Sequence, residues 1–422
     1  MEMELNAPET IDTRTRHPDA RLGYAFAVLL FVVGCDLYVV APLLPDIQTS
    51  FGVTLTMAGL LVTVFTAGYT LASPLIGGLT DRVGRRAVLH AGLLFFIVFE
   101  AVSAWAPNFA VLLVARALTG IAAAAITPTA YTIIGDAVPY RERGHVMSIA
   151  SVGFSVSAIG GVPLGLWLSD FWSWRGVIWA LTAATVAAAG ALAFGLAAQP
   201  ATELAARKQP QKAGASFAET RSIFAATGPV LAVSCLAFAA LGLVYTYLVV
   251  DLGSVWHWSN EVVVGFLFVY GIANVAGNLA LGRLGDLWGK DRGVRVGQAI
   301  EFIALLGVAG ASFWHRSWAL VLALVIFAVG QAYIPNLKAM ASAVAPELRG
   351  RSQAWNNASM YGGMMVGSCA ASYGYRVFGL TGLSIAAATV VAFGWLVAGA
   401  TGRQSPERAP RRRFSSFWTS KP

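Results

Sequence analysis

Residues Gly77–Arg86 read GGLTDRVGRR, and a shorter copy of this stretch, GRLGDLWGK, begins 205 residues later at Gly282. Both copies lie in a short gap between two long apolar stretches. Alignment of their glycines and aspartates matches four residues of each copy: Gly77, Asp81, Gly84 and Arg85 with Gly282, Asp286, Gly289 and Lys290. A basic, glycine-punctuated loop that recurs once in each half of the chain predicts a duplicated bundle of membrane helices.

The composition agrees with a membrane protein. Of the 422 residues 57% are apolar and only 12% are charged, and the mean hydropathy is +0.66, so there are too few charges for the surface of a water-soluble domain. A helix needs about 20 mostly apolar residues to cross a bilayer. Twelve stretches qualify, at 22–42, 57–78, 87–105, 109–133, 146–168, 177–198, 229–250, 262–281, 296–313, 318–338, 353–372 and 380–400.

The polar loops divide these spans into two sets of six, so we predict an all-α membrane protein with two six-helix, pseudo-symmetric halves. The two halves repeat each other again at VPYRERG (138–144) and APELRG (345–350). The expected organisation is a tail, a first half, a linker, a second half and a basic tail, at 1–21, 22–198, 199–224, 225–400 and 401–422.

Basic residues set the predicted orientation. Of the 29 Lys and Arg residues, two lie inside predicted spans, Arg116 and Lys338, and 24 lie on the side of the termini. The loops on the far side hold three, Arg175, Arg316 and Arg376. The positive-inside rule therefore predicts that both termini are in the cytoplasm of a cell whose inner membrane holds the protein.

Several other classes of protein are disfavoured. Cys35, Cys235 and Cys369 all fall in spans, so neither a disulfide nor a metal site is expected, and the five histidines have no ligand spacing. The glycine-rich loops lack the Lys-Ser/Thr pair of a nucleotide-binding loop, so no cofactor is implied. No catalytic Ser/His/Asp order stands out, so the chain is not expected to be an enzyme. The basic tail near Arg408 fits anionic lipid better than nucleic acid.

Asp36 and Arg116 are the charges of most interest in the first half. Asp36 lies about 21 Å along the outward-running first span, and Arg116 lies about 10 Å along the inward-running fourth span. Both charges are therefore about 9–10 Å from the outer edge of a core of about 30 Å. Charges at such depth usually pair and face the interior. We expect Asp36 to accept a proton and Arg116 to modulate it or to bind an anionic part of a substrate. The alternatives are a static ion pair that fixes helix packing, or an Asp36 carboxylate bonded to a cavity water.

The second half has no such pair, because Gly242 and Ala323 occupy the corresponding positions. It offers amides and phenols that are candidates for a substrate cavity: Tyr245, Tyr333, Asn336 and Asn356. The alternative is that these groups bond between helices. Glu301, in the ninth span, is a second candidate for proton binding. Glu100, near the outer end of the third span, and Lys338, at the inner end of the tenth, receive no role in coupling.

Three motifs resemble the major facilitator superfamily, and in particular its twelve-span drug:proton antiporter branch. The loop after span 2 matches the family pattern at Gly77, Asp81, Arg82, Gly84, Arg85 and Arg86. Span 4 matches at Arg116 and Gly120, with Thr119 where glutamine is usual. Span 5 reads GGVPLG, with Val162 between Gly161 and Pro163 where the antiporters have adjacent Gly-Pro, and this variant is similar to sugar-efflux and arabinose-efflux-like members.

The resemblance implies a two-lobed carrier that works by alternating access. Spans 1 and 4 of each half would line its cavity, and Asp81 and Asp286 would belong to latches between the halves. Span 5, bendable through Gly161, Pro163 and Gly165, would pack against span 8 as a gating surface. A topogenic basic loop and a glycine-rich helix without a gating role are the simpler alternatives.

The expected function is therefore proton-coupled export of a small organic molecule such as a sugar, nucleoside or amino-acid derivative. A proton-independent facilitator or an importer of the same fold is the alternative, and a membrane receptor or scaffold is a further one. The expected partners are the substrate, protons and the lipid bilayer, and a monomer suffices for this mechanism.

Overall fold

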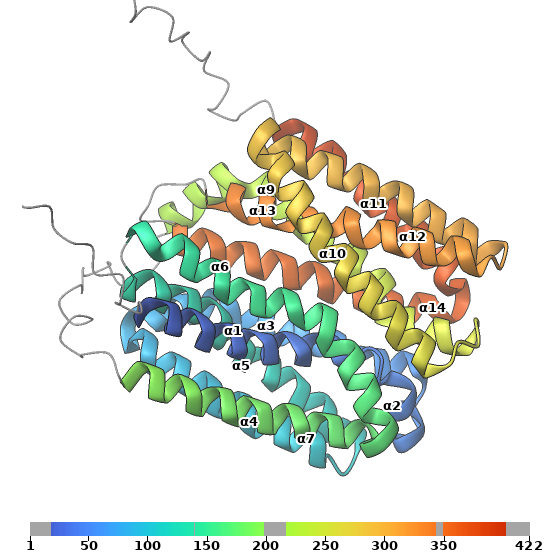
Figure 1. Ribbon diagram of the computed structural model, residues 1–422, viewed down its shortest axis with the longest axis horizontal. Helices are drawn as coiled ribbons and strands as arrows, with labels where there is room; N and C mark the ends of the chain where they lie inside the picture. The colour runs from blue at the N-terminus through green and yellow to red at the C-terminus, as the bar shows by residue number, and fades with distance from the viewer. Residues whose placement is uncertain (1–17, 139, 198–216, 343–348, 402–422) are drawn as a thin grey trace, which may run out of the picture.

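The computed structural model describes residues 18–138, 140–197, 217–342 and 349–401, and every regular element in these ranges is a helix (Figure 1). The first half contains α1 (Pro18–Val39), α2 (Leu44–Phe51), α3 (Leu55–Val83), α4 (Arg85–Trp105), α5 (Phe109–Ala137), α6 (Tyr140–Val156), the π-helical η1 (Ser157–Gly161) and α7 (Val162–Ala197). The second half contains α9 (Phe217–Ser254), α10 (Asn260–Trp288), α11 (Lys290–Phe313), α12 (Ser317–Gly330), the 3₁₀-helical η2 (Gln331–Tyr333), α13 (Ile334–Ala341) and α14 (Arg349–Thr401).

Within the described ranges, ten helical stretches are long and apolar enough to cross a membrane. Two of them contain a reversal, because α7 is interrupted at Ser173 (φ 61°) and α14 at Gly379 (φ 57°), where the backbone leaves the helical region. The part of α7 before Ser173 continues α6 and η1 without a gap, and the part after it runs back. Contacts show the reversal in α14: Tyr375 bonds Asp251 near the end of α9, whereas Trp395 stacks on Arg295 near the start of α11. The predicted all-helical fold is confirmed.

Helix boundaries differ from the predicted spans mainly by extension. The first helix begins at Pro18, four residues before the predicted span, and α9 begins at Phe217, inside the segment predicted to be a linker. Most of that linker, most of the N-terminal tail and nearly all of the C-terminal tail lie outside the described residues.

The repeated loop has the same backbone geometry in both halves. Gly84 joins α3 to α4 with φ 100° and ψ 143°, and Gly289 joins α10 to α11 with φ 102° and ψ 142°. A side chain strongly disfavours this region of φ, so glycine permits the tight helix-to-helix connection at both places. The sequence repeat is therefore also a repeat of structure.

The halves meet along two helix pairs. Helix α3 packs along α14, and α10 contacts η1 and α7. Hydrogen bonds cross this junction from Thr63 to Ser368 (Oγ1–Oγ 2.9 Å) and from the Tyr247 hydroxyl to the Leu55 carbonyl (3.0 Å). These contacts hold the halves together toward the end of the bundle that bears α2. We call this end the far end, and it lies opposite the start of α1 (Figure 1).

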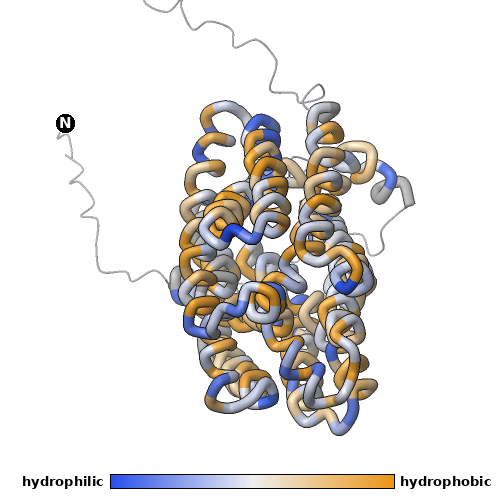
Figure 2. The backbone as a smooth tube through the Cα atoms, turned by 90° about the vertical axis from the view of Figure 1, so that its right-hand side faces the viewer, coloured by the Kyte–Doolittle hydropathy of each residue, from blue (hydrophilic) through white to orange (hydrophobic). Residues whose placement is uncertain are grey.

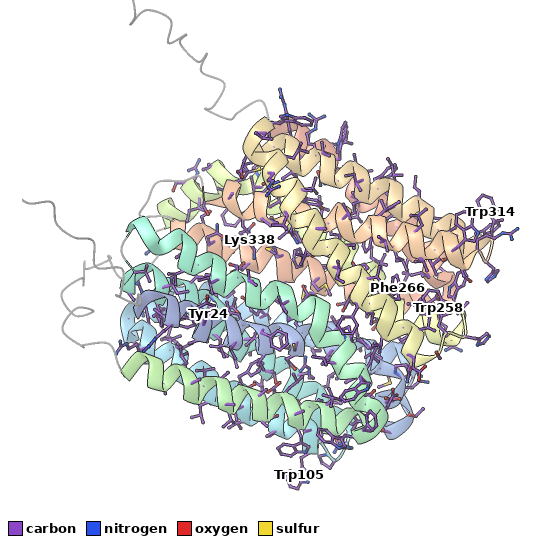
Figure 3. The ribbon with its side chains drawn as sticks, viewed as in Figure 1. Tyr24, Trp105, Trp258, Phe266, Trp314 and Lys338 are labelled. Atoms are coloured by element: carbon purple, nitrogen blue, oxygen red, sulfur yellow. The ribbon has the colours of Figure 1, made fainter. Side chains whose placement is uncertain are left out.

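The outside of the bundle is apolar. Leu75 and Leu287 are 75% and 79% exposed, values that a water-soluble protein rarely tolerates across many positions. Figure 2 views the bundle from the far end and shows hydrophobic residues along its helices. Trp105 and Trp314 are exposed and project outward near the far end (Figure 3). Tryptophan is enriched where a membrane protein meets the membrane–water interface. The protein is a multi-pass membrane protein.

The glycines of the fifth span bring it close to α1 of the same half. A Cβ at Gly153 would lie 1.9 Å from the Ala27 carbonyl oxygen, and one at Gly161 would lie 2.3 Å from Cys35 Sγ. One at Gly165 would lie 2.0 Å from a Val39 methyl group. All three therefore allow close packing against α1, because helix contact at this distance leaves no room for a side chain. Helix α10 also contacts η1 and α7, so span 5 packs against span 8 as expected, and the gating role of Gly161, Pro163 and Gly165 stays a prediction.

Candidate functional site

Asp36 on α1 and Arg116 on α5 form an ion pair inside the first half. Arg116 Nη1 lies 2.5 Å from Asp36 Oδ1, and Nη2 donates to the Asp36 carbonyl oxygen at 3.3 Å. The guanidinium also lies over the ring of Phe65 on α3, 4.7 Å from its centroid. The structure thus brings together the two residues that the sequence places at one depth.

The pair is sealed from solvent in this conformation. Asp36 is 0% and Arg116 1% exposed, so neither faces an open cavity, although the sequence interpretation expected water access. Close packing of α5 on α3 explains part of the seal: a Cβ at Gly120 would lie 2.0 Å from the Phe65 carbonyl oxygen. Access of water or protons to the pair therefore requires another conformation.

Glu100 on α4 is the third member of this buried cluster. Its side chain is 0% exposed, and Oε2 accepts a hydrogen bond from the Thr185 hydroxyl of α7 at 3.2 Å. Glu100 interacts electrostatically with both Asp36 and Arg116 and lies within hydrogen-bonding reach of Asp36. Sequence reasoning assigned it no role. A carboxyl group four to five residues from the end of an apolar span was the only available signal, and it did not indicate which helix the group faces.

The second half buries its own glutamate on the corresponding helix, α11. Glu301 is 0% exposed, and its Oε2 accepts a hydrogen bond from the Tyr333 hydroxyl at 2.8 Å. Tyr270 of α10 donates to Gln331 Oε1 at 3.2 Å beside it. Two of the predicted residues, Glu301 and Tyr333, are therefore brought together, in a polar cluster separate from the Asp36–Arg116 pair.

The two predicted amides are engaged in bonds between helices. Asn336 Nδ2 donates to the Leu281 carbonyl oxygen of α10 at 3.0 Å, and its side chain fills the space beside Gly285. Asn356 Oδ1 accepts from the Ser234 hydroxyl of α9 at 2.8 Å. Both side chains are buried, which favours the packing interpretation in this conformation.

Aromatic side chains fill the middle of the junction between the halves. Tyr245 of α9, a predicted cavity residue, meets Tyr38 of α1 edge to face with ring centroids 5.6 Å apart. Tyr69 of α3 stacks on Tyr361 of α14 at 3.5 Å. Because these rings come from opposite halves, any motion that parts the halves must separate them.

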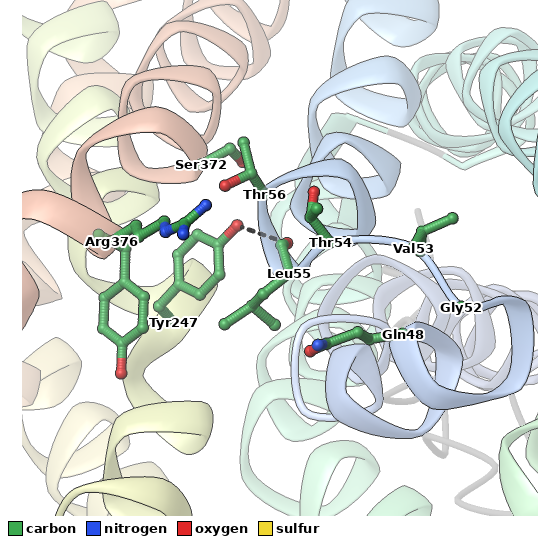
Figure 4. Close-up of a pocket in the computed structure, with 10 residues that line it drawn as sticks. Gln48, Gly52, Val53, Thr54, Leu55, Thr56, Tyr247, Ser372 and Arg376 are labelled. Atoms are coloured by element: carbon green, nitrogen blue, oxygen red, sulfur yellow. Dashed lines mark hydrogen bonds between the residues drawn. The ribbon is translucent and has the colours of Figure 1, made fainter.

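A cavity of about 440 Å³ opens at the far end between the α2–α3 connection, the last turns of α9 and the part of α14 just before its kink at Gly379. Figure 4 shows Gln48, Thr54 and Thr56 on one side and Tyr247, Ser372 and Arg376 on the other. The hydrogen bond from Tyr247 to Leu55 joins the two sides. Sequence reasoning did not find this crevice, because its two sides come from segments about 190 to 330 residues apart.

The predicted latch residues lie at the end of the bundle that bears the termini. Arg82 is exposed, and Arg85 and Arg86 are half-buried at the start of α4. The Asp81 side chain lies outside the described residues, so its latch contacts stay a prediction. In the second copy, Asp286 forms an ion pair with Lys290 one turn later in sequence, within the same half.

Comparison with known proteins identifies the family. The sequence profile of the Major Facilitator Superfamily matches residues 26–268 and 230–421. The uncharacterized MFS-type transporter YwfA of Bacillus subtilis (strain 168) is 27% identical over 398 residues, covering 92% of this chain and 94% of that protein. A chloramphenicol resistance protein of Streptomyces lividans is 29% identical over 269 residues, covering 62% and 66% of the two chains.

Solved structures agree on the fold. The D-xylose–proton symporter superposes with a TM-score of 0.74 at 15% identity, covering 92% of this chain and 98% of that one. The human organic anion transporter MFSD10 superposes with a TM-score of 0.70 at 18% identity, covering 91% and 100%. The chain belongs to the major facilitator superfamily. It is accordingly a membrane transporter of the secondary type and not an enzyme.

Proposed function

We propose that the protein is a proton-coupled exporter that exchanges a small organic molecule for protons by alternating access. The observation that carries the proposal is the ion pair between Asp36 and Arg116, buried in the membrane-spanning part of the first half. The likeness to a chloramphenicol resistance protein supports export over import. The excess of basic residues beside the termini supports a cell-membrane orientation with both termini in the cytoplasm.

The coupling follows from the electrostatics of the pair. A carboxylate held by a guanidinium resists protonation, and a carboxylate that loses this partner inside an apolar bundle takes up a proton readily. A change of conformation that moves α1 relative to α5 therefore changes the proton affinity of Asp36. If substrate competes for the same groups, proton and substrate alternate, as exchange requires.

The junction between the halves supports a rocking motion. The described contacts at the far end join the halves through single hydroxyl bonds, and aromatic rings pack in the middle of the junction. Asn260 and Asp170 add an exposed bond between α10 and α7 at the same end (2.7 Å). These contacts would have to break for the carrier to open on the far side.

The test is transport in proteoliposomes with an imposed pH gradient, with radiolabelled chloramphenicol as the first probe in a screen of small organic molecules. We expect transport that depends on the gradient and that Asp36→Asn uncouples from it. Asp46→Asn, at an exposed position of α2, is the matched control and should behave as the wild type. Transport that ignores the pH gradient would identify a facilitator. Gradient-driven transport that survives in Asp36→Asn would remove Asp36 from the mechanism.

A further inference from the structure

The buried cluster of the first half contains two carboxyl groups and one guanidinium. Asp36, Glu100 and Arg116 are each at most 1% exposed. If both carboxyl groups are ionised, the cluster carries a net charge of −1 in an apolar environment, which costs several kcal/mol. One added proton makes the cluster neutral.

Hydrogen bonding also indicates that the cluster holds one added proton. Arg116 donates to Oδ1 and to the carbonyl oxygen of Asp36. The Thr185 hydroxyl shares its one hydrogen between Oε2 of Glu100 (3.2 Å) and the Leu181 carbonyl oxygen (2.9 Å). The remaining oxygens, Asp36 Oδ2 and Glu100 Oε1, are buried and have no donor among the described residues. The two carboxyl groups lie within hydrogen-bonding reach of each other, but two carboxylates cannot bond each other, since both only accept. A single proton on either of them supplies the missing donor.

Among the described residues, no neighbouring group donates to either of these two oxygens. The titratable groups nearby are Cys35 of α1 and Tyr361 of α14, and no described hydrogen bond joins either of them to Asp36 or Glu100. Helix α5 contributes Arg116, α7 contributes the neutral Thr185, and α3 contributes the ring of Phe65. Arg116 is thus the one positive charge in the cluster among the described residues.

We propose that Asp36 and Glu100 hold one proton between them, so that Glu100 is the second proton-binding residue of the transporter. When the cluster opens to water, hydronium delivers the proton to one carboxylate and leaves as water. The resulting carboxyl group donates to the other carboxylate, whose charge Arg116 balances. Loss of the proton restores two carboxylates and one guanidinium. This inference rests on the proposed coupling role of the Asp36–Arg116 pair.

The experiment is infrared difference spectroscopy of the purified protein in lipid, recording the C=O stretch of protonated carboxyl groups while pH is varied. Every protein compared carries Glu301→Gln, because Glu301 is another buried carboxyl group. The parent protein should show a titrating carboxyl band that both Glu100→Gln and Asp36→Asn remove. In Asp36→Asn, Glu100 should ionise, because it becomes the only carboxylate beside Arg116. Asp46→Asn should leave the band unchanged.

Two results would overturn the shared proton. One is a band that Glu100→Gln leaves intact. The other is a band that persists in Asp36→Asn and disappears only when Glu100 is also replaced, since the proton would then belong to Glu100 alone. If Glu100→Gln does not fold, the Asp36→Asn spectrum still decides whether the two carboxyl groups share the proton. Transport is measured separately, so failure of the shared proton with intact pH-driven flux is distinguishable from failure of the proposed function.

Discussion

Replacement of the two partners of the buried ion pair should have unequal effects on stability. In Arg116→Met the cluster loses its one positive charge, two hydrogen bonds to Asp36 and the contact with Phe65. Removal of one partner from a buried pair costs about 3–5 kcal/mol. In Asp36→Asn the amide oxygen still accepts from Arg116, and Glu100 still supplies a carboxylate.

The cost of Asp36→Asn follows from the bond that weakens. Arg116 keeps its charge, so its bond to the new amide oxygen is still a hydrogen bond to a charged group, which contributes about 1.5–3 kcal/mol, and the loss within that range is no more than about 1.5 kcal/mol. Asp36→Asn should therefore be more stable than Arg116→Met by at least about 1.5 kcal/mol, the difference between these two estimates. The double variant Asp36→Asn/Glu100→Gln removes both carboxylates and leaves the buried charge of Arg116 without a partner. Its loss of unfolding free energy should therefore be about 3–5 kcal/mol, as for Arg116→Met.

The assay is equilibrium unfolding in mixed micelles of mild detergent and SDS, followed by tryptophan fluorescence. Asp46→Asn serves as the control, and since Asp46 lies in the first turn of α2, its loss should cost no more than about 1 kcal/mol. The reasoning is refuted if Asp36→Asn destabilises the protein as much as Arg116→Met does. Equal costs would mean that Glu100 does not compensate Arg116.

Three further predictions test the packing, the second cluster and the junction. In a thermal-unfolding assay, Gly153→Ala should destabilise the protein by at least about 2 kcal/mol, because the added methyl group overpacks against α1. Gly160→Ala is the control and should be neutral or stabilising, because its Cβ meets no described atom within 4 Å. Tyr333→Phe should cost about 1–3 kcal/mol in SDS unfolding, because it removes a donor from a buried carboxylate; an unchanged stability would show that water replaces it. Thr63→Cys with Ser368→Cys, in a background without the native cysteines, should form a disulfide that stops transport until it is reduced, since the two hydroxyl oxygens are 2.9 Å apart across the junction. Either cysteine alone should leave transport insensitive to oxidant.

Much of the fold could be predicted from the chain. Apolar length determines which segments cross a membrane, and a loop that needs glycine at one position in each half, Gly84 and Gly289, indicates the duplication. The depth of Asp36 and Arg116 also follows from counting residues along their helices, because each residue advances a helix by 1.5 Å. These quantities are local, so they do not depend on how the helices pack.

The site could be predicted only in part, because rotation of a helix about its axis is decided by its neighbours. The glycines of span 5 that pack closely point toward Ala27 and Cys35 of α1, because tertiary packing sets the rotation of their helix. Asn336 fills the space beside Gly285 for the same reason.

Counting along the chain determined that this protein is a duplicated, membrane-spanning bundle with a carboxylate and a guanidinium at one depth. Only the tertiary structure decided that Glu100 joins them and that all three are closed off from water. The physical reason is that the length of an apolar span fixes how deep a charge lies, whereas the packing of the neighbouring helices fixes what the charge meets.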